Sequence, residues 1–152
     1  MRTLVRTVAE AAGRGLVAGL VGTAAMTLSS TVEARLTGRG ASTTPADAAQ
    51  KVSGLDPGDD EGRQRFSESV HWTYGTVWGV PRALLGAAGV RGLPASGAHL
   101  AAVWGSEQLM LPALGVADPV WRYGAQAATT DALHHLVYAV TTGVVSDWLD
   151  RD

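Results

Sequence analysis

The feature that most constrains this chain is a long run without a single charged residue, from Gly15 to Val32. At about 1.5 Å of rise per residue, a helix of this length reaches nearly across a bilayer core of about 30 Å. The run therefore predicts a membrane-spanning helix over about 15–36. A basic segment precedes it, as in a signal peptide, but Glu10 interrupts that segment and no clear cleavage signature follows. We therefore expect the helix to be retained.

Three further segments have the apolar character of membrane-spanning helices, over about 64–90, 96–114 and 122–148. The residues between the first and second helices, about 37–63, are rich in Gly, Pro, Asp, Ser and Thr. This composition predicts a loop outside the membrane, with a short surface helix near 46–52. The sequence thus predicts an all-α fold, an integral membrane four-helix bundle that forms a single domain over residues 1–152.

The composition excludes several classes of function. Hydrophobic residues make up 46% of the chain and charged residues only 17%, which is a low charge content for a soluble protein. The formal net charge of -2 leaves no basic excess for a phosphate backbone, so we expect no nucleic-acid partner. The absence of cysteine excludes disulfides, thiolate metal sites and a thiol nucleophile. We expect the lipid bilayer to be the principal partner.

One face of the first predicted helix consists largely of small residues. Such residues let helices approach closely in lipid, so the face predicts inward packing. It ends in a carboxylate, which also belongs inside a bundle rather than in lipid. The face recurs at steps of three and four residues: Gly15, Gly19, Gly22, Met26, Ser29 and Glu33.

Ionisable residues within the predicted spanning helices form a pattern. Such residues are costly in lipid and usually face the bundle interior, which makes each a functional candidate. The first and third helices each contribute one acid, the second an acid-x-x-His pair and the fourth an acid-x-x-His-His run. An up-and-down bundle directs all of them toward one end. The candidate cluster comprises Glu33, Glu68, His71, Glu107, Asp131, His134 and His135.

This pattern is compatible with several functions. One acid from each of two helices and an acid-x-x-His pair from each of the others is the ligand set of di-iron and di-manganese carboxylate proteins, so a divalent metal or di-iron centre is the candidate cofactor. We favour an intramembrane cluster that binds an ion or relays protons. The alternatives are a membrane di-metal carboxylate oxidase or oxygenase, and a structural subunit partnered by a second copy or another membrane protein. Ordinary hydrogen bonds between helices also account for these residues.

Several short motifs in the last three predicted helices have a parallel in a known family. They are His71, the glycine-bounded turn from Gly86 to Gly97, the stretch around Glu107 that runs into LPALGVADP, and Asp131 followed by HLVY. In these motifs the chain resembles the YagU-like family of small bacterial inner-membrane proteins, with His135 rather than His134 at the family's histidine. The resemblance implies a multi-pass protein of the inner (plasma) membrane and no particular reaction.

Overall fold

The protein is all-helical in the computed structural model, which describes residues 2–151. Its elements are α1 (Arg2–Thr37), α2 (Thr44–Ser53), α3 (Asp60–Ala87), α4 (Gly92–Ala113), the short 3-10 helix η1 (Val120–Arg122) and α5 (Ala125–Leu149). No strand occurs in the described part of the chain. The four long helices fall where the apolar segments predict helices, and α2 falls within the predicted loop. The all-α prediction is confirmed.

Some helix boundaries differ from those expected. α1 begins at Arg2 rather than near residue 15, because the preceding segment continues the helix and carries an Arg6–Glu10 ion pair one turn apart, at 2.7 Å. α3 begins at Asp60, where the side chain of Asp59 accepts a hydrogen bond from the backbone N–H of Gly62 at 2.8 Å. The polar first turns of α3 therefore extend the helix beyond the apolar segment.

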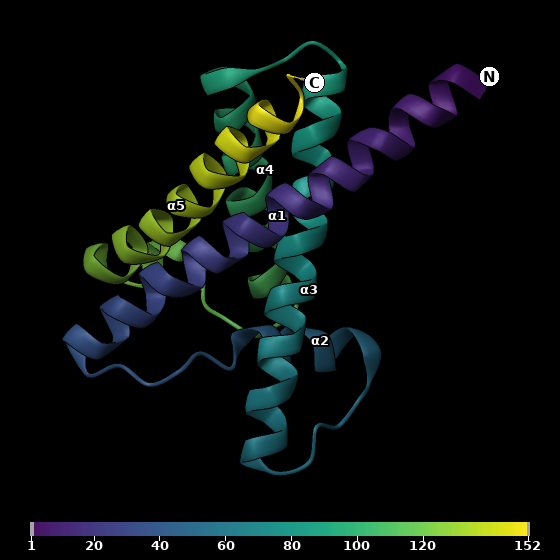
Figure 1. Cartoon of the computed structure of the whole chain (residues 1–152). Coiled ribbons are helices and arrows are strands. Elements are labelled where there is room, and N and C mark those ends of the chain that lie inside the picture. Colours follow the sequence, from purple (N-terminus) through teal and green to yellow (C-terminus); the bar gives the residue numbers. More distant parts are fainter. Residues whose placement is uncertain (1, 152) are drawn as a thin grey trace.

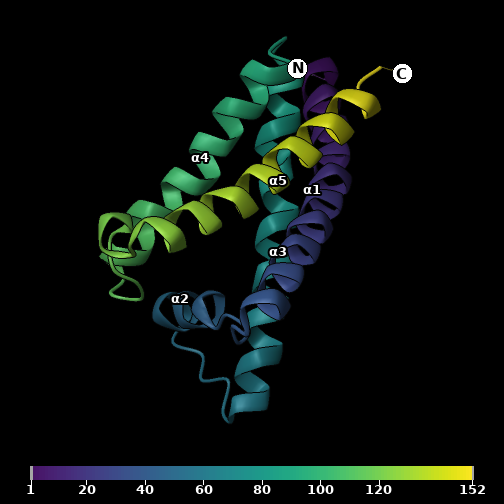
Figure 2. The ribbon, with the colours of Figure 1, turned by 90° about the vertical axis from the view of Figure 1, so that its left-hand side faces the viewer.

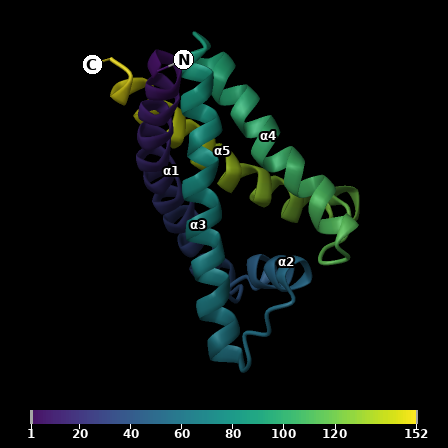
Figure 3. The ribbon, with the colours of Figure 1, turned by 90° about the vertical axis from the view of Figure 1, so that its right-hand side faces the viewer.

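The long helices are close together at one end and diverge at the other. α1 packs along α3 and also contacts α5, and α4 packs on α5 (Figure 1). In the two side views, α4 and α5 diverge from α3 toward the end at which α2 lies (Figures 2 and 3). The C-terminus lies at the opposite, closed end.

Glycines bring α1 and α3 into backbone contact. A Cβ atom at Gly15 would lie 2.6 Å from the Cα of Val80, and one at Gly79 would overlap the carbonyl oxygen of Gly15. Gly22 faces α5 instead, where a Cβ would lie 3.1 Å from the ring of Tyr138. The inward packing predicted for this face is confirmed, and the face contacts two helices rather than one.

The interior of the bundle differs from that of a soluble protein, which is built from large apolar side chains. Among the described residues, the buried apolar side chains are alanines together with Val103 and Tyr138. Many Leu and Val residues are instead exposed, and such residues occur on all four long helices. The buried polar residues are Thr23, Ser67, Arg82, His99, His134, His135, Thr142 and Ser146.

By length and average hydropathy, one described helix qualifies to cross a membrane, namely Thr3–Thr37 within α1. The prediction of four spanning helices over about 15–36, 64–90, 96–114 and 122–148 is therefore confirmed only for the first, because α3, α4 and α5 do not meet this criterion. The multi-pass topology is therefore unsupported by average hydropathy. The physical reason is that these helices carry charged and other polar side chains, which lower the average. Four of these side chains, those of Arg82, His99, His134 and His135, are buried.

A buried ion pair joins three helices at the closed end. Arg82 of α3 is fully buried, and its Nη2 donates a hydrogen bond to Oδ1 of Asp147 in α5 at 2.8 Å. The other oxygen of Asp147 accepts from the backbone N–H of Gly92, the first residue of α4, at 3.1 Å. Nearby, Asp150 pairs with Arg14 of α1 at 3.1 Å. Carboxylates near the end of α5 thus connect all four long helices.

The α1–α3 contact should tolerate no side chain. We expect Gly19→Leu to destabilise the folded protein by about 3 kcal/mol, because any Cβ there would overlap the carbonyl oxygen of Thr76. Leu20→Ala, on the exposed side of the same helix, should change stability far less. Thermal unfolding in detergent, followed by circular dichroism, measures both. Equal tolerance at the two positions would contradict the assigned packing.

The Arg82–Asp147 pair should be important for stability. We expect Asp147→Ala to cost about 3 kcal/mol, because it leaves a fully buried guanidinium without its carboxylate. The matched control is Glu61→Gln, which removes one partner of the exposed Arg65–Glu61 pair and should leave the unfolding temperature unchanged. The same unfolding measurement checks both variants, and similar stability in the two would show that the buried pair is not critical.

Candidate functional site

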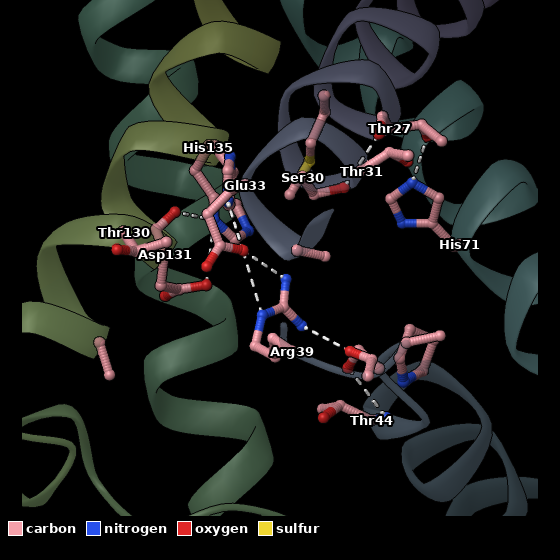
Figure 4. Close-up of a pocket in the computed structure, with 18 of the residues that line it drawn as sticks. Thr27, Ser30, Thr31, Glu33, Arg39, Thr44, His71, Thr130, Asp131 and His135 are labelled. Atoms are coloured by element: carbon pink, nitrogen blue, oxygen red, sulfur yellow. Dashed lines mark hydrogen bonds and ion pairs between the residues drawn. The ribbon is translucent and has the colours of Figure 1, made fainter. Parts of the chain in front are cut away.

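A cavity of about 1630 Å³ opens where the helices diverge. It lies between the C-terminal half of α1, the chain that leads into α2, the first half of α3, the end of α4 and the start of α5 (Figure 4). We call this cavity the vestibule. The structure brings all seven residues of the candidate cluster to its wall: Glu33, Glu68, His71, Glu107, Asp131, His134 and His135.

These seven residues do not converge into a metal centre. Across residues 2–151, no group of three or more His, Asp or Glu side chains is close enough to hold a metal ion. The dinuclear arrangement expected from the sequence pattern is therefore not formed. Two of the carboxylates interact with other side chains. Glu68 accepts a hydrogen bond from Gln64 of its own helix at 3.2 Å, and Glu33 forms an ion pair with Arg39 at 2.8 Å.

His135 and Glu107 form a hydrogen bond with each other. Nδ1 of the buried His135 lies 2.8 Å from the carbonyl oxygen of Asp131, and its Nε2 lies 2.8 Å from Oε2 of Glu107. A neutral imidazole has one N–H, yet both nitrogens face oxygen atoms. A further hydrogen must therefore lie between Nε2 and Glu107, on one partner or the other. Neither arrangement leaves His135 a free lone pair for another ligand.

Two more members of the cluster are also engaged. Asp131 accepts a hydrogen bond from Nε1 of Trp104 in α4 at 2.7 Å. Nε2 of His71 lies 3.0 Å from Oγ1 of Thr27, and this hydroxyl donates its own hydrogen to the carbonyl oxygen of Thr23 (Figure 4). Thr27 must therefore accept from Nε2–H of His71, which fixes the ring's orientation.

His134 differs from these residues because one of its ring nitrogens is buried without a partner. Its Nδ1 lies 2.9 Å from Oγ of Ser29, whereas its Nε2 has no hydrogen bond. That Nε2 lies 3.8 Å from Oε2 of Glu33, beyond hydrogen-bond distance. The same carboxylate oxygen accepts from Nε and Nη2 of Arg39 at 3.1 and 2.8 Å, as Figure 4 shows.

The vestibule is acidic. Among the described residues that line it, four are carboxylates and two are arginines. Arg39 is paired with Glu33, and the Glu107–His135 pair with its shared hydrogen carries no net charge. Glu68 and Asp131 then remain against Arg35, so the net charge is negative. Tyr123 lies at the rim of the vestibule, and its pKa is raised above the ordinary value of 10.0. The largest cause is burial, and the negative charges of Asp131, Asp118 and Glu107 contribute as well. A cavity lined by an excess of one sign of charge raises the local concentration of ions of the opposite sign.

A smaller cavity of about 40 Å³ lies deeper in the bundle. It shares Met26, His71, Glu107 and His135 with the wall of the vestibule. Tyr138 bounds it as well, and its hydroxyl donates to the carbonyl oxygen of Gly75 at 2.6 Å. A volume above about 15 Å³ accommodates a water molecule, so the Glu107–His135 pair stands between the vestibule and a water-sized inner space.

Sequence reasoning missed three residues that organise these contacts. Arg82 carries a signal that could have identified it, since it is a cation within an otherwise apolar part of α3. Arg39 and Thr27 carry no comparable signal. Arg39 is one of several arginines in a polar loop, and Thr27 is one of many small residues in α1.

Comparison of the chain with protein-family models, with curated proteins and with solved structures finds no match. The resemblance to the YagU-like family accordingly stays a prediction. The function must be argued from the geometry of the chain itself.

Proposed function

We propose that the protein is an integral membrane protein whose vestibule draws cations from water to a binding site inside the helix bundle. The observation that supports the membrane environment is the inverted polarity of the long helices. In water, an outer surface rich in Leu and Val would be an extended apolar patch of the kind that soluble monomers rarely show. In lipid, the same surface is favourable and the buried polar groups are correctly placed.

The same observation supports a multi-pass arrangement. α5 exposes Leu133, Val140 and Val144 while it buries His134 and Thr142. Its outward surface is therefore more apolar than the helix as a whole. The mean hydropathy of a helix combines its two faces. In the proposed arrangement lipid contacts only the outward face, so the hydropathy of that face is the relevant quantity.

The acidic vestibule supports cations as the bound species. Its carboxylates outnumber its arginines, and His134 beside them offers a ring nitrogen that has no hydrogen-bond partner. An oxidase that depends on a dinuclear metal centre has less support, because the residues available for such a centre are engaged with other partners.

Membrane integration is tested by fractionation. We expect the chain to stay in the membrane pellet after alkaline carbonate extraction and to require detergent for release, because helices that contact lipid do not detach at high pH. A variant with Val140→Glu and Val144→Glu on the exposed face of α5 should be depleted from the membrane fraction. Recovery of the unchanged chain in the carbonate supernatant would contradict the proposal.

Cation attraction is tested by thiol labelling, for which the cysteine-free chain is an unreactive background. In Thr31→Cys, which places a thiol on the vestibule wall, we expect a cationic methanethiosulfonate to react about tenfold faster than an anionic one, after correction for their rates with free cysteine. Glu68→Gln with Asp131→Asn should lower this ratio several-fold.

The matched control is Val52→Cys, an exposed position that does not line the vestibule. There the same two substitutions should leave the ratio of rates unchanged. An anionic reagent that reacts at Thr31→Cys as fast as the cationic one would contradict an acidic, cation-attracting vestibule.

A further inference from the structure

We infer that Glu33 and His134 form a binding site for a divalent transition-metal ion, with the guanidinium of Arg39 as a built-in competitor for the carboxylate. The inference rests on the proposed function and deepens it, because it names the class of cation and the two side chains that bind it.

The first argument concerns the free nitrogen of His134. The side chain is more than nine-tenths buried, and its Nε2 has no hydrogen-bond partner. Burying a polar atom without a hydrogen-bond partner costs free energy, and a bound ligand would remove that cost. A carboxylate oxygen, Oε2 of Glu33, lies 3.8 Å from this nitrogen. Two bonds of about 2.1 Å each to one metal ion can span atoms up to about 4.2 Å apart.

The second argument concerns the orientation of the ring. A histidine that binds a metal through one nitrogen almost always donates its other N–H to a neighbouring acceptor, which fixes the tautomer. Oγ of Ser29 lies 2.9 Å from Nδ1 of His134 and can accept such a bond. The Nε2 lone pair is then free, and the nitrogen lies 3.8 Å from Oε2 of Glu33. Glu33 is oriented as well, since Oγ1 of Thr37 lies 3.0 Å from its Oε1.

The third argument is that Glu33 already binds a cationic group. Arg39 donates two hydrogen bonds to the same carboxylate oxygen that faces His134. Its side chain is 44% exposed and belongs to the chain between α1 and α2, so it can move away without disturbing a helix. Exposed ion pairs contribute little to stability, which makes the guanidinium a displaceable competitor.

The donor set selects the class of ion. Imidazole nitrogen together with carboxylate oxygen suits zinc, iron, cobalt, nickel and manganese, whereas calcium and magnesium prefer oxygen alone. Two protein ligands leave the remaining positions to water, so binding is reversible. A two-residue site is also consistent with the lack of any group of three candidate ligands within residues 2–151. The ion is therefore a reversibly bound species rather than a permanent structural metal.

The test is titration of Zn²⁺ alone into the full-length chain, without a histidine tag, in detergent at neutral pH, with calorimetry as the readout. We expect one zinc ion per chain. His134→Gln and Glu33→Gln should each weaken binding at least tenfold, and Ser29→Ala should weaken it about tenfold. Arg39→Gln should strengthen binding several-fold, because it removes the competing cation without removing a ligand.

His71→Gln is the matched control, since it removes another histidine of the vestibule and should leave the zinc affinity unchanged. Unaltered affinity in His134→Gln, or weaker binding in Arg39→Gln, would overturn the site. If His134→Gln does not fold, the zinc affinities of Arg39→Gln and Ser29→Ala test the site instead, because Arg39 and Ser29 are not ligands of the ion. Absent zinc binding together with cation-selective thiol labelling would refute this site alone, whereas loss of both would also refute the proposed function.

Discussion

The contact on which the rest of the structure depends is the direct approach of α1 to α3 through their glycines. Gly15, Gly19 and Gly79 leave no room for a side chain between the two backbones. With α1 and α3 held together, and with Asp147 joining α3, α4 and α5 at the closed end, the helices can diverge only at the other end. The vestibule opens at that end, so close packing of the helices at the closed end leaves a cavity at the open end.

Polar groups occupy the interior that this packing encloses. They continue along α5 from His134 and His135 through Tyr138 and Thr142 to Ser146, all of which are buried. Burying a polar group is costly unless it has a partner, and three of these residues, His134, His135 and Tyr138, have one on another helix. His134 stands out because one nitrogen lacks a partner and faces a carboxylate. Other buried polar atoms also lack a hydrogen-bond partner, among them Oγ1 of Thr142 and Nδ1 of His99. The functional hypothesis rests on Nε2 of His134, because this atom combines the lack of a partner with a carboxylate oxygen 3.8 Å away.

Helix positions and the small face of α1 could be predicted because periodicity and apolar length are local properties of the sequence. The gathering of the acids and histidines at one end could also be predicted, since it follows from helix order alone. Their pairing could not. His134 and His135 are adjacent in sequence, and only the packing of α1 and α4 decides that the first meets Ser29 and the second meets Glu107. Arg39 reaches Glu33 from an irregular segment that no periodicity describes.

The central claim is that the outer surface of the bundle contacts lipid, and spin labelling along α5 tests it most directly. Single cysteines at Val140 and Val144 in the otherwise cysteine-free chain, reconstituted in vesicles, report collisions with oxygen and with a water-soluble nickel chelate. The account predicts high oxygen and low nickel accessibility at these two positions, and low accessibility to both at the buried Thr142. Nickel collisions at Val140 and Val144 as frequent as at the exposed loop residue Leu55 would contradict it.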